Sequence, residues 1–168
     1  MLKIIAIDPS GNHDSENEGM GTTGLAYDNE INEISLHEIK AADYPNTCEY
    51  WFAVTDFLFQ NNPQVVVIEG YKLYNHKGMS AQTQANSTLM TSQLIGAIKM
   101  WCHIRGIPFH IQYAADVKTR WSDKVLQAKG YLDEKNRFNG EPTNAHKRDA
   151  LRHLLHFKKY KQAQEAGL

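Results

Sequence analysis

Short, almost continuously apolar runs alternate along this chain with stretches of helical periodicity. Residues 2–7 are apolar at nearly every position, and residues 64–69 contain the β-branched run Val65-Val66-Val67-Ile68, which is typical of strands buried on both faces of a sheet. In residues 31–39, Ile34 and Leu36 alternate with Ser35 and His37, which favours a strand with one wet face. The pattern predicts five strands in all: 2–7, 22–27, 31–39, 64–69 and 109–113.

Helices are indicated between and after these strands. The sequence Asn46-Thr47-Cys48-Glu49 is a capping signature that starts a helix running to about Gln60. A long amphipathic helix is predicted over Ser80 to Arg105, before Gly106 and Pro108. Two more helices are predicted, one capped by Asp116 and ending near Gly130, and one after Pro142.

This order of elements defines the fold class. Three consecutive strands come first, and strands then alternate with helices, which predicts an α/β protein with a mixed sheet and helices on both faces. We expect one domain over residues 1–168, since the chain has 168 residues and 42% hydrophobic content. It shows no signal peptide and no apolar run long enough to span a bilayer, so we expect a cytoplasmic protein. Cys48 and Cys102 are interpreted as free buried thiols.

Charge is distributed unevenly along the chain, although the formal net charge is only −1. Residues 1–70 carry two Lys and Arg against twelve Asp and Glu, whereas residues 71–168 carry sixteen against seven. A basic half that also holds six of the eight histidines suits a polyanionic partner, and the acidic half can supply ligands for cations. The alternative is that these charges only solvate the surface.

Three acidic residues lie at positions where a purely structural role is a poor explanation. Asp8 and Glu69 each close an apolar strand, and Asp149 lies in the basic C-terminal helix with His146 three residues before it. Carboxylates at the ends of buried strands repel one another and lose solvation, so this placement predicts a divalent metal between them. His153 shares the helical face of His146 and Asp149, but we interpret it as structural.

Each of these residues also has an ordinary explanation. Asp8 before Pro9 can be a turn residue, Glu69 a solvated strand end, and Asp149 a balance for neighbouring positive charge. His146 can be a surface or capping residue. Their joint placement is what favours chemistry.

The ordered motifs resemble those of the RuvC-type Holliday junction resolvases, especially the phage-encoded branch, within the ribonuclease H-like superfamily. The resemblance rests on Asp8-Pro9 after Ile-Ala-Ile, Thr23-Gly24-Leu25-Ala26, Val67-Ile68-Glu69 and His146-Lys147-Arg148-Asp149-Ala150. It implies a five-stranded sheet of order 3-2-1-4-5 with strand 2 antiparallel. It also implies a homodimeric endonuclease that resolves four-way DNA junctions by paired cuts. Asp8, Glu69, His146 and Asp149 would be catalytic and would bind two Mg²⁺ ions, with Mn²⁺ able to substitute.

Contacts to DNA are expected mainly from the basic half. At the position three residues after Glu69, where the resolvases commonly carry an aromatic wedge, this chain has Lys72, flanked by Tyr71 and Tyr74, which can stack on an opened base. Mobile lysine ammonium groups can meet phosphates without reading bases. The predicted nucleic-acid-binding residues are Tyr71, Lys72, Tyr74, Lys77, Lys118, Arg120 and Lys124.

Three other functions compete with junction resolution. The acids do not encode the type of nucleic acid, so a YqgF-like nuclease acting on RNA or on other branched DNA is an alternative. A non-catalytic DNA-binding module is another, although the intact acid set argues against it. Gly21-Thr22-Thr23-Gly24 resembles the phosphate loop of actin-type and sugar-kinase-type phosphotransferases. Those proteins need two such domains, so we expect no nucleotide cofactor. We also expect no membrane partner.

Overall fold

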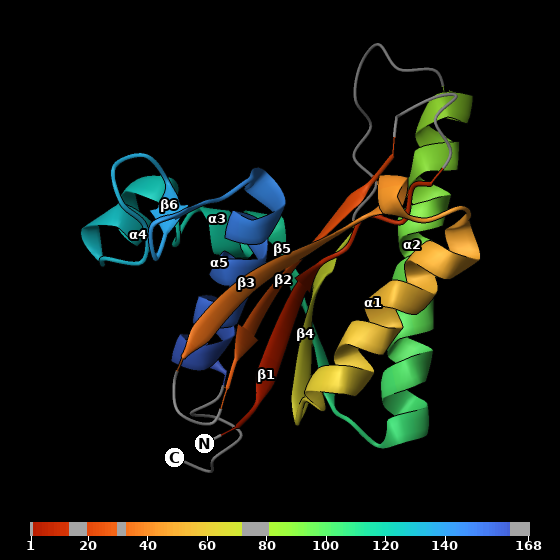
Figure 1. The fold of residues 1–168 in the computed structure, drawn as a ribbon, viewed down its shortest axis with the longest axis horizontal. Helices are drawn as coiled ribbons and strands as arrows, with labels where there is room; N and C mark the ends of the chain where they lie inside the picture. The colour runs from red at the N-terminus through yellow and green to blue at the C-terminus, as the bar shows by residue number, and fades with distance from the viewer. Residues whose placement is uncertain (1, 14–19, 30–32, 72–80, 162–168) are drawn as a thin grey trace.

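The computed structural model describes residues 2–13, 20–29, 33–71 and 81–161, and for residues 81–89 it describes the backbone only. A five-stranded mixed sheet forms the centre of the molecule, in the order β3-β2-β1-β4-β5 (Figure 1). Strand β2 is antiparallel to both neighbours, while β1, β4 and β5 are parallel. The predicted strand order and direction are therefore confirmed. The strands are Ile4–Asp8, Thr22–Asp28, Ile34–Lys40, Val65–Gly70 and Phe109–Tyr113.

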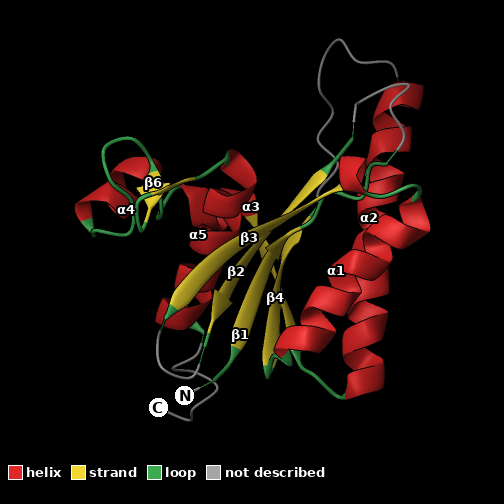
Figure 2. Cartoon of the chain, in the orientation of Figure 1, coloured by secondary structure: helices red, strands yellow, loops and turns green. Residues whose placement is uncertain are grey.

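Helices cover both faces of this sheet, as the element order predicts (Figure 2). Helices α1 (Thr47–Asn61) and α2 (Ala81–Arg105) lie on one face, and α3 (Ala114–Lys118), α4 (Asp123–Ala128) and α5 (Ala145–Tyr160) lie on the other. Helix α1 begins at the predicted place, because the Asn46 side chain accepts a hydrogen bond from the backbone N–H of Glu49.

Alternation along β1 divides its side chains between two cores. Ile5 and Ile7 pack with α1 and α2, whereas Ile4 and Ala6 pack with α5 and its neighbours. All four are fully buried. A strand buried on both faces needs apolar residues on both, which is why residues 4–7 form a continuous apolar run.

Two sequence predictions about the second half of the chain are wrong in detail. The helix expected from Asp116 to Gly130 is two short helices, and Asp116 lies inside α3 rather than capping it. Ser122 caps α4 by accepting a hydrogen bond from the N–H of Val125. The loop before α5 contains a small hairpin of β6 (Arg137–Phe138) and β7 (Glu141–Pro142) that the pattern did not indicate, since two-residue strands show no periodicity.

Side-chain burial also corrects some expectations. Cys102 is buried as predicted, but Cys48 is exposed in the first turn of α1, and both are free thiols. In α2, the apolar residues Leu94 and Ile98 belong to the core. Among the described residues, no helix combines the length and apolar character needed to cross a membrane.

A glycine allows α5 to approach the sheet closely. Gly24 of β2 lies opposite Asp8 of β1. A Cβ atom on Gly24 would lie 2.1 Å from the carbonyl oxygen of His146, in the first turn of α5. A contact this short with backbone cannot be relieved by a rotamer change. The absence of a side chain at position 24 therefore places the first turn of α5 beside the end of β1.

We predict that Gly24→Ala destabilises the protein by about 1–3 kcal/mol, because it moves α5 away from the sheet. Gly96→Ala is the control: it lies inside α2 and its Cβ would meet no atom within 4 Å. We expect that substitution to be stabilising by about 0.5–1 kcal/mol, as replacement of a helical glycine usually is. Urea unfolding measures both, and equal effects of the two substitutions would contradict the close-approach explanation.

Candidate metal centre

Strand register and alternation bring the first two acids together. Strands β1 and β4 pair in parallel with Ile7 opposite Ile68, so the next residues, Asp8 and Glu69, emerge side by side. Each follows the alternation of its strand, Ile4 and Ala6 in β1 and Val65 and Val67 in β4, onto the face covered by α5. Both carboxylates therefore point toward that helix.

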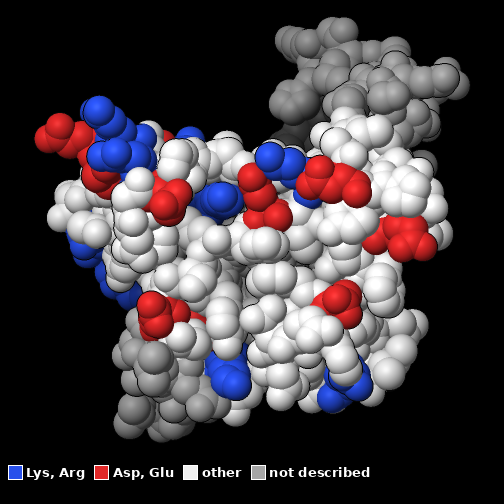
Figure 3. All heavy atoms as spheres, viewed as in Figure 1, with Lys and Arg blue, Asp and Glu red and all other residues white. Residues whose placement is uncertain are grey.

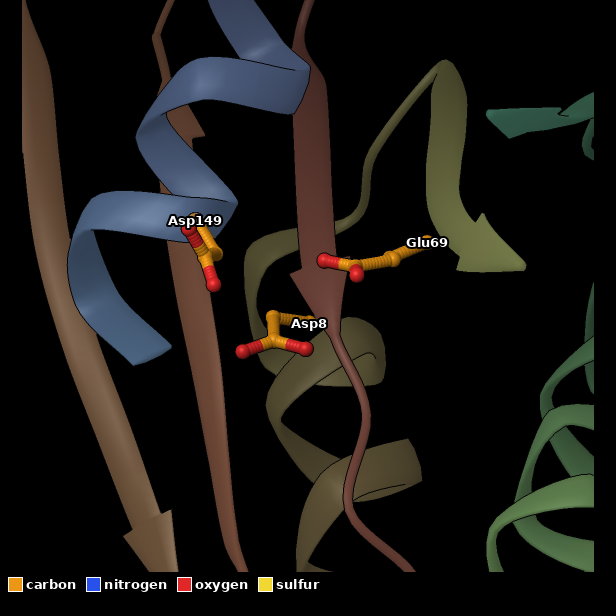
Figure 4. A group of neighbouring side chains, drawn as sticks. All are labelled: Asp8, Glu69 and Asp149. Atoms are coloured by element: carbon orange, nitrogen blue, oxygen red, sulfur yellow. The ribbon is translucent and has the colours of Figure 1, made fainter. Parts of the chain in front are cut away.

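Helix α5 brings the third acid to the same place. Its N-terminus is capped by Asn144, whose side chain accepts a hydrogen bond from the N–H of Lys147, and Asp149 follows one turn later. In Figure 4 the side chains of Glu69 and Asp149 extend toward that of Asp8. Each offers one oxygen, and these three oxygens lie within 4.8 Å of one another. The sequence prediction that these three acids meet is thus matched by the geometry.

The environment of Asp8 opposes its ionisation. Its side chain is only 14% exposed. Burial raises its pKa from 3.8 to about 6; Glu69 and Asp149 also raise it, while His146 lowers it. His146 Nδ1 lies 3.0 Å from Asp8 Oδ2, and this hydrogen bond raises the pKa of His146. His146 therefore lies beside Asp8, as its spacing from Asp149 predicts.

Asp149 is held between two basic side chains. Lys118 Nζ lies 2.8 Å from Asp149 Oδ2, and Arg152 bonds the other oxygen. Arg152 also pairs with Asp123 and donates from Nε to the backbone oxygen of Trp121 at 2.7 Å. Burial opposes the charge of Lys118 and is the largest single effect on its pKa, but the hydrogen bond to Asp149 and the negative charges of the acid cluster together outweigh it and raise the pKa.

Glu69 has a buried partner that the sequence indicated only weakly. His153 Nε2 lies 3.0 Å from Glu69 Oε2, and His153 Nδ1 lies 3.0 Å from Gln112 Oε1. The shared helical face of residues 146, 149 and 153 was the signal for His153. Gln112 stands opposite Glu69 in the pairing of β4 with β5, which cannot be read from sequence without the register.

The chain that follows Asp8 is fixed by a buried network. The Tyr50 hydroxyl donates to the carbonyl oxygen of Ser10 at 2.6 Å and lies 2.8 Å from Thr23 Oγ1. The backbone N–H of Ser10 donates to Thr23 Oγ1 at 3.3 Å. The hydroxyl groups of α1 and β2 thus satisfy the backbone of the turn and stabilise the end of β1 that carries Asp8.

This donor set suits a hard divalent cation. Carboxylate oxygens are the preferred protein ligands of Mg²⁺ and Mn²⁺, and an imidazole nitrogen lies next to Asp8. Burial and mutual repulsion disfavour the charged form of Asp8, and a cation would relieve both effects. The residues present therefore fit a metal centre.

The predicted nucleic-acid-binding residues are only partly described. Lys72, Tyr74 and Lys77 lie outside the described residues. Tyr71 is 43% exposed, one residue beyond the end of β4. Lys118 joins the acid cluster itself. The other two are exposed: Lys124 on α4, and Arg120 with its guanidinium carbon 5.0 Å from the ring centroid of Tyr160.

The surface mixes the two signs of charge. Figure 3 shows Lys and Arg side chains at the end of the molecule that carries α4 and the β6-β7 hairpin, and Asp and Glu lie among them. One such pair joins Arg137 to Asp133. On this face the basic half of the sequence does not form an uninterrupted basic surface.

Comparisons with solved structures place this geometry in a known fold. RuvC of T. thermophilus, in a structure titled as a complex with a Holliday junction substrate, aligns with a TM-score of 0.66 at 16% sequence identity, covering 97% of this chain and 96% of that one. Another Thermus thermophilus RuvC structure aligns with a TM-score of 0.61 at 16% identity, covering 97% of both chains. No protein-family model and no curated protein sequence matches the chain.

These similarities show that the chain has the ribonuclease H-like fold of RuvC. The resemblance in the sequence motifs is therefore confirmed at the level of the fold. It extends over almost the whole length of both proteins, so the two chains are of comparable extent.

Proposed function

We propose that this protein is a metal-dependent, structure-selective endodeoxyribonuclease that resolves four-way DNA junctions by paired phosphodiester hydrolysis. The observation that carries the proposal is the meeting of Asp8, Glu69 and Asp149, from three separate elements, within 4.8 Å. The RuvC fold supports the choice of substrate, because a structure of that fold holds a Holliday junction. Structured RNA and other branched DNA remain substrates against which the proposal is tested.

Two Mg²⁺ ions are the proposed cofactors, with Mn²⁺ as a substitute, bound by Asp8, Glu69, His146 and Asp149. When bound, such ions activate a water molecule and stabilise the leaving 3′ oxygen. Asp8 suits this role because burial and the neighbouring acids disfavour its negative charge when no cation is bound. The imidazole of His146 is a softer donor than carboxylate oxygen and suits Mn²⁺ better than Mg²⁺.

Lys118 is the basic residue best placed to act beside the acids. Its ammonium group lies 2.8 Å from Asp149 Oδ2, and its side chain is 50% exposed. The long, mobile side chain would reach a phosphate bound next to Asp149. Tyr71 would stack on an unpaired base at the junction, and Arg120 and Lys124 would contact the backbone farther out.

A homodimer is part of the proposal, since two matched cuts require two acid clusters. A groove of about 380 Å³ between α1 and α2 supports a symmetric interface there. Phe52 and Phe59 in this groove are 64% and 52% exposed. The Arg105 guanidinium carbon lies 4.6 Å from the Phe59 ring centroid and 5.8 Å from that of Trp101. Exposed aromatic rings with an arginine are characteristic of interface centres.

We predict that Asp8→Asn, Glu69→Gln and Asp149→Asn each slow cleavage of a labelled four-way junction in Mg²⁺ by more than about 100-fold, because each removes a metal ligand. Gel-shift affinity for the junction should stay within about threefold of the wild type, measured in Ca²⁺. Asp43→Asn is the matched control, since it makes the same chemical change on an exposed residue outside the cluster.

The same assay with duplex DNA and structured RNA tests the substrate. The proposal expects symmetric cuts in the junction and at least about tenfold slower cleavage of the other two. Wild-type rates in any two of the three acid variants would show that the site is misassigned. Faster cleavage of RNA than of the junction would show that the proposed substrate is wrong and that the nuclease activity is right.

We predict that Phe59→Glu converts the proposed dimer into a monomer, because it replaces an exposed aromatic ring of the groove with a charged side chain. Light scattering during size exclusion should give twice the chain mass of 19.1 kDa for the wild type and one chain mass for the variant. Ala128→Glu, which adds the same charge to exposed α4 on the other side of the sheet, should remain dimeric. A wild-type monomer, free and bound to junction DNA, would instead indicate a nuclease that makes single cuts.

A further inference from the structure

His153 is a buried histidine with two side-chain partners, and the proposed chemistry does not use it directly. It lies in the third turn of α5 and its side chain is only 1% exposed. Its two ring nitrogens face different strands, with Nε2 toward Glu69 of β4 and Nδ1 toward Gln112 of β5, each at 3.0 Å. The ring therefore connects the helix to both strands at the metal centre.

The chemistry of the partners fixes where a proton must lie. An ionised carboxylate only accepts hydrogen bonds, so the contact with Glu69 requires a proton on Nε2 of His153. Gln112 can present either its oxygen or, with the amide turned, its NH₂ group to Nδ1. In both amide orientations the Nε2 proton of His153 points at Glu69.

This contact restricts one oxygen of Glu69. Glutamate has three rotatable side-chain bonds, and the Glu69 side chain is 16% exposed at a strand end, so packing alone leaves it room to turn. The hydrogen bond from His153 holds Oε2 against α5. The other oxygen is then left for the space shared with Asp8 and Asp149.

We propose that His153 is a positioning residue that orients Glu69 for metal binding, with Gln112 holding the ring in place. The inference rests on the proposed function, because it assigns Glu69 to the metal. Hydrogen bonds of this kind behind a ligating carboxylate typically change metal affinity by about 10- to 100-fold. If His153 served only for packing, a substitution that removes its hydrogen bond to Glu69 would leave the metal affinity unchanged.

Two substitutions of similar polarity separate positioning from packing. The amide nitrogen of a glutamine at position 153 can take the place of Nε2 and donate to Glu69, while that of an asparagine reaches only the place of Nδ1. We expect His153→Asn to raise the dissociation constant for Mn²⁺, measured by calorimetry, by about tenfold or more. His153→Gln should stay within about threefold of the wild type.

Thermal unfolding of both variants without metal controls for packing. The inference expects similar melting temperatures for the two variants but different Mn²⁺ affinities. Equal Mn²⁺ affinities in His153→Asn and His153→Gln would overturn it and leave the nuclease proposal standing. Failure of the wild type to bind Mn²⁺ would overturn the metal-dependent function itself, and the role of His153 with it.

A measurement on the wild type covers the case in which neither variant folds. Long-range ¹H–¹⁵N correlation spectra of the histidine rings report which ring nitrogen carries a proton. The inference expects a proton on Nε2 of His153 in the metal-free protein at neutral pH. A ring protonated only at Nδ1 could not donate to Glu69 and would overturn the proposal.

Discussion

The parallel pairing of β1 with β4 is the constraint on which the site depends. Because Ile7 lies opposite Ile68, the strand ends place Asp8 beside Glu69, and alternation turns both toward α5. A shift of one residue in either strand would send its carboxylate to the face of α1 and α2. The apolar runs before the two acids therefore do more than form a core, since their pairing brings the two carboxylates to the same face of the sheet.

Gathering three carboxylates in this way has an electrostatic cost, and the fold offsets it with specific partners. Asp8 bonds His146, Asp149 lies between Lys118 and Arg152, and Glu69 bonds His153. These partners come from α5 and α3, the elements that pack over the strand ends. The acids are thus surrounded by groups that orient them without a cation, and a divalent ion would add the charge that the cluster lacks.

Much of this arrangement could be predicted because it depends on local patterns. Five strands, the start of α1 at Asn46 and the convergence of Asp8, Glu69 and Asp149 follow from apolar runs, a capping signature and the position of acids at strand ends. The strand order came from the resemblance to known resolvases, since apolar alternation does not specify which strands pair.

The rest depends on tertiary contacts that no local pattern carries. The break between α3 and α4 occurs where buried Trp121 packs in the core and its backbone oxygen accepts a bond from Arg152. The role of Gln112 depends on the β4-β5 register. His153 has the spacing of a site residue, yet its buried contacts with Glu69 and Gln112 decide what it does.

At neutral pH the fold holds Asp8 in an unfavourable charged state, which a bound divalent cation would relieve. The pKa of Asp8 is raised from its ordinary value of 3.8 to about 6 in the folded protein, so the folded state binds the proton more tightly than the unfolded chain does. The stability contributed by protonated Asp8 is fully present below about pH 4 and is lost as the pH rises through about 6. Asp8→Asn lacks this titration.

The most direct test is the free energy of unfolding of the wild type and of Asp8→Asn between pH 4 and 8, with and without Mg²⁺. Without the ion, the variant should gain about 1–3 kcal/mol of stability relative to the wild type as the pH rises through this range, since one pKa unit corresponds to about 1.4 kcal/mol. Saturating Mg²⁺ at pH 7.5 should stabilise the wild type and leave the variant nearly unchanged. A stability difference that does not change with pH, together with equal effects of Mg²⁺ on both proteins, would contradict the account.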